Sequence, residues 1–252
     1  MKPILFEWHT FLIYSYPLFL GLSWGLGFQL VKYLWEKMPS LRARGISDFY
    51  ILISGIFIFS WIGSKVFFLF FSDPQWRHLQ STSFWLGGGF VFYGGLIGGL
   101  LFLWLFCKIK KIPSIQVLAL MAPALCFAHA IGRIGCLLAG CCYGKETTLP
   151  WGLWIHDGHR HPVPLYETIL LGVLGVVLMN MILKKKDDFN IVTTYLMGYG
   201  VLRFILEYLR GDQIRGVGQW GTTSQLISIL AIVGAVALWI YARPTRRKGI
   251  RT

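Results

Sequence analysis

The sequence consists of long runs of hydrophobic residues separated by short polar segments. Each run is about 17 to 25 residues long, the length that lets an α-helix cross the hydrocarbon core of a membrane. Alternation of single apolar and polar residues, which marks the strands of outer-membrane β-barrels, is absent. We therefore expect a bundle of about seven transmembrane helices, at residues 10–31, 48–71, 89–107, 114–132, 164–183, 191–209 and 223–242.

The composition supports an all-α integral membrane protein. Of the 252 residues, 55% are hydrophobic and 14% are charged, and the mean hydropathy is +0.59, values that exclude an ordinary soluble domain. We find no internal repeat and predict a single transmembrane domain over residues 1–252. Within it, the segment 132–163 carries Gly, Cys, His, Trp and Pro, and we expect it to form a packed cap.

The net charge of +13 comes largely from basic residues in alternate loops. These residues are Lys32, Lys37, Arg42, Arg44, Lys108, Lys110, Lys111, Lys184, Lys185, Lys186, Arg243, Arg246, Arg247, Lys248 and Arg251. The positive-inside rule makes these loops and the C-terminus cytoplasmic, and the N-terminus and the cap outward-facing. The basic tail then favours contact with anionic inner-leaflet lipid over nucleic acid. No removable signal peptide is visible, so we expect the first span to direct insertion.

A first candidate site lies at the outer end of the fourth predicted span. Arg133 stands between Gly132 and Gly135, and His129 precedes it by four residues, on the same helical face. A charge inside a membrane segment needs a partner, and an anionic lipid head group provides one. The alternative is an arginine that snorkels to the interface beside a histidine satisfied by a carbonyl.

A second candidate site is a polar stripe in the sixth predicted span. Tyr199, Arg203, Glu207 and Arg210 fall on one narrow face of an otherwise apolar helix. Such residues normally face a partner or a watery cavity. A structural ion pair between Arg203 and Glu207 is the alternative, and both interpretations can hold together.

Two further segments reach the same predicted membrane face. Tyr93, Gly94 and Gly95 begin the third span, where small residues would equally serve close helix packing. Arg160 and Glu167 flank the entry to the fifth span, where the prolines would equally mark a helix start.

The cysteines leave several possibilities open. Cys136, Cys141 and Cys142 are expected near the outer face, where disulfides form, whereas Cys107 and Cys126 lie within spans. A bridge from Cys136 to one of the adjacent pair is more plausible than a strained bridge between neighbours. Free thiols are possible too. The spacing matches no standard C-x₂-C pair arrangement for zinc, so we predict no metal.

Together, four motifs resemble the prolipoprotein diacylglyceryl transferase family. In chain order they are Tyr-Gly-Gly-Leu-Ile-Gly (93–98), Gly-Arg-Ile-Gly (132–135), Arg-His-Pro-Val-Pro-Leu-Tyr-Glu (160–167) and Gly-Tyr-Gly-Val-Leu-Arg-Phe-Ile-Leu-Glu (198–207). The resemblance covers nearly the whole chain and implies seven spans with the N-terminus outside. It implies transfer of the diacylglyceryl group from phosphatidylglycerol to the lipobox cysteine of a prolipoprotein, with release of glycerol phosphate.

The resemblance also assigns residues. It makes Arg133 the signature arginine and Arg203 the second essential arginine, both facing the lipid head group. Tyr199 and Glu207 match positions beside Arg203, and Tyr14 matches, loosely, a tyrosine of the first span.

This chain departs from the family pattern at three positions. Tyr93 stands where the family usually has a histidine, often held to be the proton acceptor, and Cys136 and Cys141 stand at the usual asparagine and glutamate. His129 lies one turn from Arg133 and titrates near neutral pH, so our hypothesis is that it replaces the missing base while Tyr93 donates a hydrogen bond.

We therefore expect a transferase in the bacterial inner membrane, acting at the outer leaflet on phosphatidylglycerol and a prolipoprotein signal peptide. No cofactor is expected, because the chain lacks a Walker loop or a dinucleotide fingerprint. The alternatives are the same lipid donor with another acceptor, a non-enzymatic phospholipid-binding or transport protein, and a membrane thiol oxidoreductase.

Overall fold

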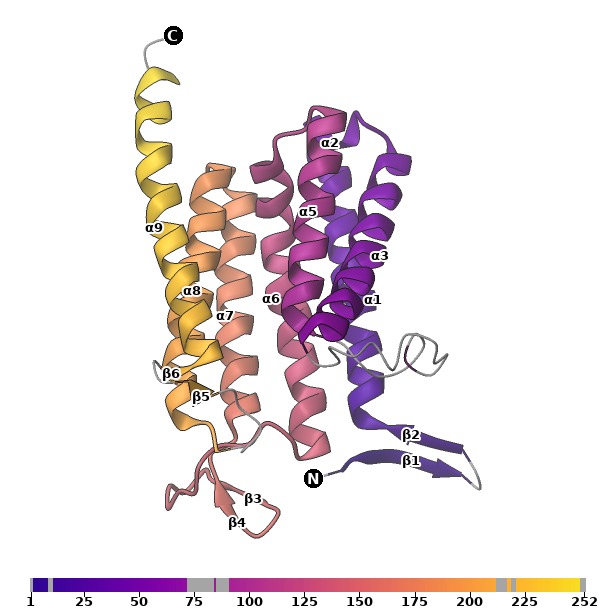
Figure 1. The fold of residues 1–252 in the computed structure, drawn as a ribbon, viewed down its shortest axis with the longest axis vertical. Helices are drawn as coiled ribbons and strands as arrows, with labels where there is room; N and C mark the ends of the chain where they lie inside the picture. Colours follow the sequence, from indigo (N-terminus) through magenta and orange to yellow (C-terminus); the bar gives the residue numbers. More distant parts are fainter. Residues whose placement is uncertain are drawn as a thin grey trace. The chain divides into compact units, whose positions relative to one another are not determined.

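The structure, a computed structural model, describes residues 2–8, 11–71, 84, 91–211, 217–218 and 221–249, which are mostly helical (Figure 1). Within these ranges, six helices are long and apolar enough to cross a membrane. They are α3 (Ile46–Phe71), α5 (Phe92–Lys110), α6 (Ser114–Ala139), α7 (Val163–Leu183), α8 (Asp188–Leu209) and the Thr223–Ala242 part of α9 (Thr223–Gly249). This result confirms the prediction of an all-α integral membrane protein.

The N-terminal region differs from the expected helix at 10–31. Strands β1 (Ile4–Trp8) and β2 (Phe11–Tyr14) form an antiparallel hairpin, and helix α1 (Ser15–Lys37) follows directly. The aromatic and β-branched residues before Ser15 favour strands. The buried Ser15 hydroxyl donates to the carbonyls of Lys2 and Pro3, 2.7 and 2.8 Å away, which fixes the hairpin to the helix start.

Helix α1 has the length but not the hydropathy of the six spans. Its 23 residues correspond to about 34 Å, enough to cross a hydrocarbon core. Its glycines, serines and polar aromatics make it less hydrophobic than the others. The seventh span therefore stays a prediction.

The chain divides into two compact units, and Lys32–Val117 form one of them. Here the short helix α2 (Pro39–Arg42) precedes α3, which packs against α5. The contact is backbone to backbone, since a Cβ atom on Gly98 would collide with the carbonyl of Phe59. Gly94 and Gly95 are buried in this contact, where small residues allow the helices to approach closely.

The other unit, Met1–Val31 with Leu118–Thr252, holds α6 to α9. Helices α7, α8 and α9 are successive neighbours (Figure 1). Helix α6 meets α7 where Gly175 leaves room for the ring of Phe127 and where Thr168 donates to the carbonyl of Ala130 at 3.2 Å. The C-terminal ends of α6 and α8 therefore lie beside the N-terminal ends of α7 and α9.

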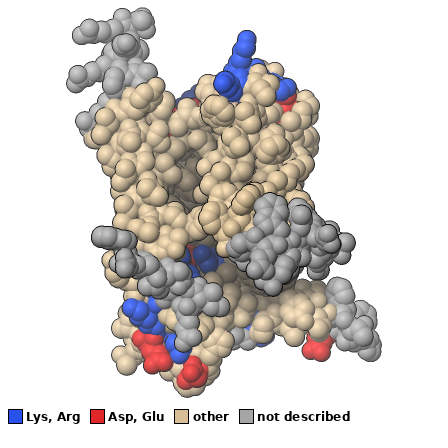
Figure 2. All heavy atoms as spheres, in the orientation of Figure 1, with Lys and Arg blue, Asp and Glu red and all other residues tan. Residues whose placement is uncertain are grey.

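The cap begins later than expected. Residues 132–139 continue α6, and the segment between α6 and α7 contains the antiparallel hairpin of β3 (Leu153–Ile155) and β4 (Gly158–Arg160). A smaller hairpin, β5 (Val217–Gly218) and β6 (Gly221–Thr222), precedes α9. Figure 2 shows mostly uncharged surface along the helices, as expected for lipid-facing surface. Charged side chains gather near β3 and β4, and others gather at the end of the Lys32–Val117 unit where α2 lies.

Candidate active site

Helices α6, α7 and α8 bring Arg133, Glu167 and Arg203 into direct contact. One carboxylate oxygen of Glu167 accepts a hydrogen bond from Nη1 of Arg203 at 2.6 Å, across 36 residues of sequence. The other oxygen pairs with Nε of Arg133. The two arginines that the sequence singled out therefore share a single buried carboxylate.

Arg203 is held by two further contacts. Its Nη2 lies 3.1 Å from Oε2 of Glu207, one helical turn along α8. The same nitrogen donates to Oγ of Ser224 at 3.1 Å, at the start of α9. The structural Arg203–Glu207 pair is thus confirmed. Ser224 was not predicted as a site residue, because a serine at a helix start is indistinguishable in sequence from an ordinary capping residue.

His129 and Tyr199 belong to the same site. Nε of Arg133, which pairs with Glu167, also lies 3.2 Å from Nε2 of His129, in position to donate to this imidazole nitrogen. The His129 and Tyr199 rings lie 5.9 Å apart between centroids. A small crevice here is lined by His129, Glu167, Leu170, Leu171, Tyr199, Leu202, Arg203 and Leu206.

The charges of this network balance, but their exposure differs. The Glu167 and Glu207 side chains are 4% and 1% exposed, whereas those of Arg133 and Arg203 are 17% and 15% exposed. Buried charges are tolerated when paired. Both glutamates are counter-ions of the guanidinium groups in the structure, and their predicted contact with substrate stays a prediction.

Other predicted residues surround the network. Arg210 is buried at the end of α8, close enough to Arg133 to interact electrostatically. Gly135 packs against Tyr16 and Phe19 of α1, where a Cβ atom would be 2.8 Å from Cβ of Phe19. Gly132 has open space at the corresponding position, which leaves room beside Arg133.

Arg160 lies in a separate charged cluster on the β3–β4 hairpin. Its Nη2 donates to Glu146 at 3.1 Å and to Asp157 at 3.0 Å, and its guanidinium lies over the ring of Tyr143. The hydrogen bond from Arg160 lowers the pKa of the Asp157 carboxyl below its usual 3.8. Its predicted contact with substrate stays a prediction.

The remaining predicted residues fall outside the network. Tyr14 ends β2 and is half-exposed. Tyr93, Gly94 and Gly95 belong to the unit formed by Lys32–Val117, which is described by itself. Their predicted roles beside the arginines therefore stay predictions.

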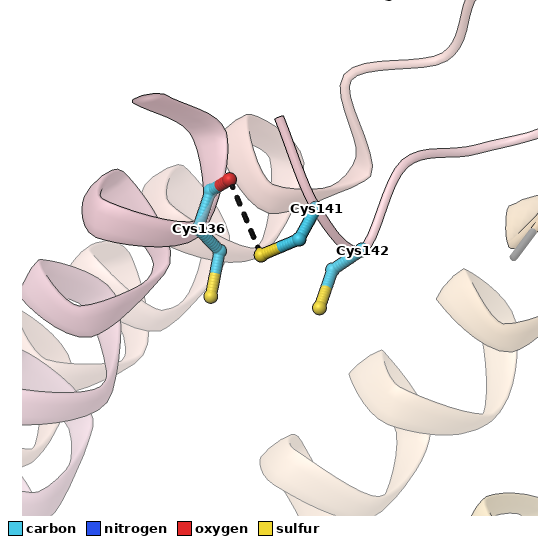
Figure 3. A group of neighbouring side chains, drawn as sticks. All are labelled: Cys136, Cys141 and Cys142. Atoms are coloured by element: carbon cyan, nitrogen blue, oxygen red, sulfur yellow. Dashed lines mark hydrogen bonds between the residues drawn. The ribbon is translucent and has the colours of Figure 1, made fainter. Parts of the chain in front are cut away.

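Three cysteine side chains gather where α6 ends (Figure 3). The sulfur atoms of Cys136, Cys141 and Cys142 lie within 4.8 Å of one another, and all three thiols are free. Hydrogen bonds from the neighbouring thiols lower the pKa of Cys142, whereas hydrogen bonding to Cys136 raises the pKa of Cys141. Of the two states that the sequence left open, a disulfide and free thiols, the structure has the free thiols.

Comparison with known proteins agrees with this arrangement. The family model described as prolipoprotein diacylglyceryl transferase matches residues 3–241. The chain belongs to this family. It is 35% identical to the phosphatidylglycerol--prolipoprotein diacylglyceryl transferase of Clostridium tetani, with 92% of this chain and 94% of the relative covered. For transferase 2 of Clostridium perfringens these values are 34%, 95% and 94%, and for the Pasteurella multocida transferase they are 29%, 90% and 89%.

Membership of the prolipoprotein diacylglyceryl transferase family confirms the resemblance drawn from the four motifs and makes this chain a transferase. The relatives match nearly their whole length, so the arginine network and the cysteine cluster both lie within the matched region.

Proposed function

We propose that this protein transfers the diacylglyceryl group of phosphatidylglycerol to the thiol of the lipobox cysteine of a prolipoprotein and releases glycerol phosphate. The relatives are named for phosphatidylglycerol and prolipoprotein. The observation that carries the proposal is the pair of arginines, Arg133 and Arg203, held on one buried carboxylate beside an apolar crevice.

The network suits a phospholipid donor. Guanidinium groups bind phosphate through two parallel hydrogen bonds, and each arginine keeps N–H donors beyond those directed at Glu167 and Glu207. Leucines line the same crevice, including Leu170, Leu202 and Leu206. A phospholipid whose phosphate binds the arginines would thus place its acyl chains against these leucines.

The reaction requires a substitution at a glycerol carbon. The acceptor sulfur, as a thiolate, forms the new S–C bond, while the C–O bond to the phosphate breaks and that oxygen keeps the electron pair. Arginines in a low-dielectric site stabilise the charge that develops on this oxygen. The proton of the thiol has to pass to an acceptor.

We assign the acceptor role to His129, with Tyr93 donating a hydrogen bond. Nε2 of His129 is occupied by Arg133 in the structure, so it becomes available when Arg133 turns toward the phosphate. His129→Ala should then abolish turnover and Tyr93→Phe should only reduce it. Intact turnover in His129→Ala together with complete loss in Tyr93→Phe would show that this assignment is wrong.

We place the protein in the bacterial inner membrane, with the N-terminus outside, the C-terminus cytoplasmic and the arginines toward the outer leaflet. Basic residues in alternate loops support this orientation. A C-terminal fusion to alkaline phosphatase, which is active only outside the cytoplasm, should be inactive. An active fusion would reverse the topology.

The decisive experiment measures transfer of labelled diacylglycerol from phosphatidylglycerol to a lipobox-cysteine peptide by the purified protein. Transfer should require Arg133, Arg203 and the peptide thiol, with a Cys→Ser peptide as control. Glycerol phosphate release without a modified peptide indicates another acceptor, and binding without release indicates a carrier. Activity that needs the cysteines but survives both arginine substitutions indicates a thiol oxidoreductase.

A further inference from the structure

The side chains of Cys136, Cys141 and Cys142 lie close together and form none of the ion pairs of the arginine network. Cys136 is buried in the last turn of α6, Cys142 is half-buried and Cys141 is exposed. The cluster therefore begins on a helix, as Figure 3 shows, and includes one exposed residue, Cys141.

The backbone after α6 turns the chain back on itself. Gly140 and Cys142 both have left-handed conformations, with φ of 73° and 59°. The amide of Cys141 donates to the carbonyl of Cys136 at 3.1 Å, and its thiol points to the same oxygen at 3.5 Å. A left-handed cysteine is uncommon, because its Cβ atom is crowded there. This turn returns two thiols to the one on the helix.

Positive charge surrounds the sulfurs. Nη1 of Arg133 donates to Sγ of Cys136 at 3.9 Å. The buried Arg210 lies close enough to Cys142 to interact electrostatically. Three thiolates and a divalent ion carry one net negative charge, which a neighbouring guanidinium compensates. The cluster can therefore hold thiolates without an unpaired charge.

We propose that Cys136, Cys141 and Cys142 form a site for a thiophilic metal ion of the Zn²⁺ class. Zinc bound by thiolates at about 2.3 Å requires sulfurs about 3.8 Å apart. The three sulfurs lie within 4.8 Å of one another, so metal binding would bring them closer by at most about 1 Å. The pattern of sequence spacing did not predict such a site, because the turn at Gly140 supplies the convergence.

Three protein ligands leave the fourth tetrahedral position open, as in catalytic rather than structural zinc sites. The exposed side of the cluster is where this position would lie. We assign it to the acceptor thiol, an assignment that rests on the proposed function. The metal would bind the acceptor sulfur as a thiolate, beside the arginine that holds the phosphate, and the thiol proton would pass to His129, the acceptor assigned above.

Metal binding alone is tested on the full chain, purified in detergent and reduced under anaerobic conditions. Titration with Co²⁺ should give one equivalent of thiolate-to-cobalt absorption in the near ultraviolet, which Zn²⁺ abolishes. Cys136→Ser and Cys142→Ser should each weaken binding at least about 100-fold, since even outer-shell changes cost metal sites about 10- to 100-fold. Double substitution of Cys107 and Cys126, which lie outside the cluster, is the matched control.

The metal site is wrong if the reduced protein shows no such absorption, or if the control variant loses it as completely as Cys136→Ser. Disulfide formation that survives the reductant would equally overturn it. Thermal unfolding of Cys141→Ser, an exposed position, separates loss of metal from loss of fold.

The open position is tested by adding the lipobox-cysteine peptide, which should change the visible cobalt spectrum while the Cys→Ser peptide should not. A spectral change without any transfer to the peptide supports the metal site but contradicts the proposed function. Full transfer by Cys136→Ser and Cys142→Ser supports the proposed function but contradicts the assigned role of the metal.

Discussion

Two clusters in this protein pair arginine with carboxylates, and they differ in where the carboxylates lie. In the first, Arg133 and Arg203 meet Glu167, whose side chain is 4% exposed. In the second, Arg160 meets Glu146 and Asp157, whose side chains are 75% and 81% exposed. The ion-pair distances of Arg203, 2.6 and 3.1 Å, are similar to those of Arg160, 3.1 and 3.0 Å, so geometry alone does not distinguish the clusters.

The surroundings do distinguish them. Water screens the hairpin cluster, and such pairs contribute little. The helical cluster spans three helices in an apolar setting, where each charge depends on its partner. Loss of a partner should therefore cost more in the helical cluster than in the hairpin cluster.

Replacing the arginines of the two clusters should give the largest difference in activity. Arg133→Ala and Arg203→Ala should each lower the rate of glycerol phosphate release at least about 100-fold, as removal of a transition-state donor does. Arg160→Ala should change it less than about fivefold. Initial rates with labelled phosphatidylglycerol and peptide measure both. An equal loss in Arg160→Ala would make the hairpin part of the active site.

The shared carboxylate should matter most for stability. Glu167→Gln leaves two guanidinium groups without their common counter-ion, and we expect the free energy of unfolding to fall by about 3–5 kcal/mol. Glu146→Gln, on the hairpin, should leave it unchanged. Denaturation in detergent micelles measures both. Glu167→Asp, which keeps the charge, should recover part of the loss; equal losses for Gln and Asp would point to packing instead.

Ser224 offers a smaller change within the same network. Ser224→Ala removes one acceptor of Arg203, and a hydrogen bond to a charged group is worth about 1.5–3 kcal/mol. We expect kcat/KM for phosphatidylglycerol to fall about tenfold or more. Ser228→Ala is the matched control, since its hydroxyl donates to the Ser224 carbonyl at 2.8 Å. Equal effects would assign the loss to the helix rather than to Arg203.

The smallest effect concerns pH and the hairpin. Arg160 lowers the pKa of Asp157 below 3.8, so this carboxylate stabilises the folded hairpin above that value, and the contribution disappears as the pH falls through the lowered pKa. The Tm of Asp157→Asn should therefore lie slightly below that of the wild type at neutral pH and coincide with it in strong acid. A Tm difference between Asp157→Asn and the wild type that grows as the pH falls would contradict this prediction.

Much of the fold could be predicted from hydropathy, because a membrane-spanning helix needs a continuous apolar run of about 20 residues, which is visible in the sequence. The ranges 48–71, 164–183 and 223–242 fall within α3, α7 and α9. The first predicted span failed at its beginning, since hydropathy does not separate an apolar strand pair from an apolar helix. Residues 132–139 were predicted to belong to the cap, because glycine and arginine are common where a membrane helix ends; in the structure they continue α6.

Hydropathy and residue type are enough to predict a helical membrane protein in which Arg133 and Arg203 stand out, because burial in lipid restricts which residues a span can contain. The contact of Glu167 with both arginines and the convergence of three cysteines become visible in the folded protein. Helical periodicity gives the face of each residue, but the partner of a charge depends on which faces meet between helices. That choice is made by packing, at positions such as Gly175 against Phe127, far from the charges themselves.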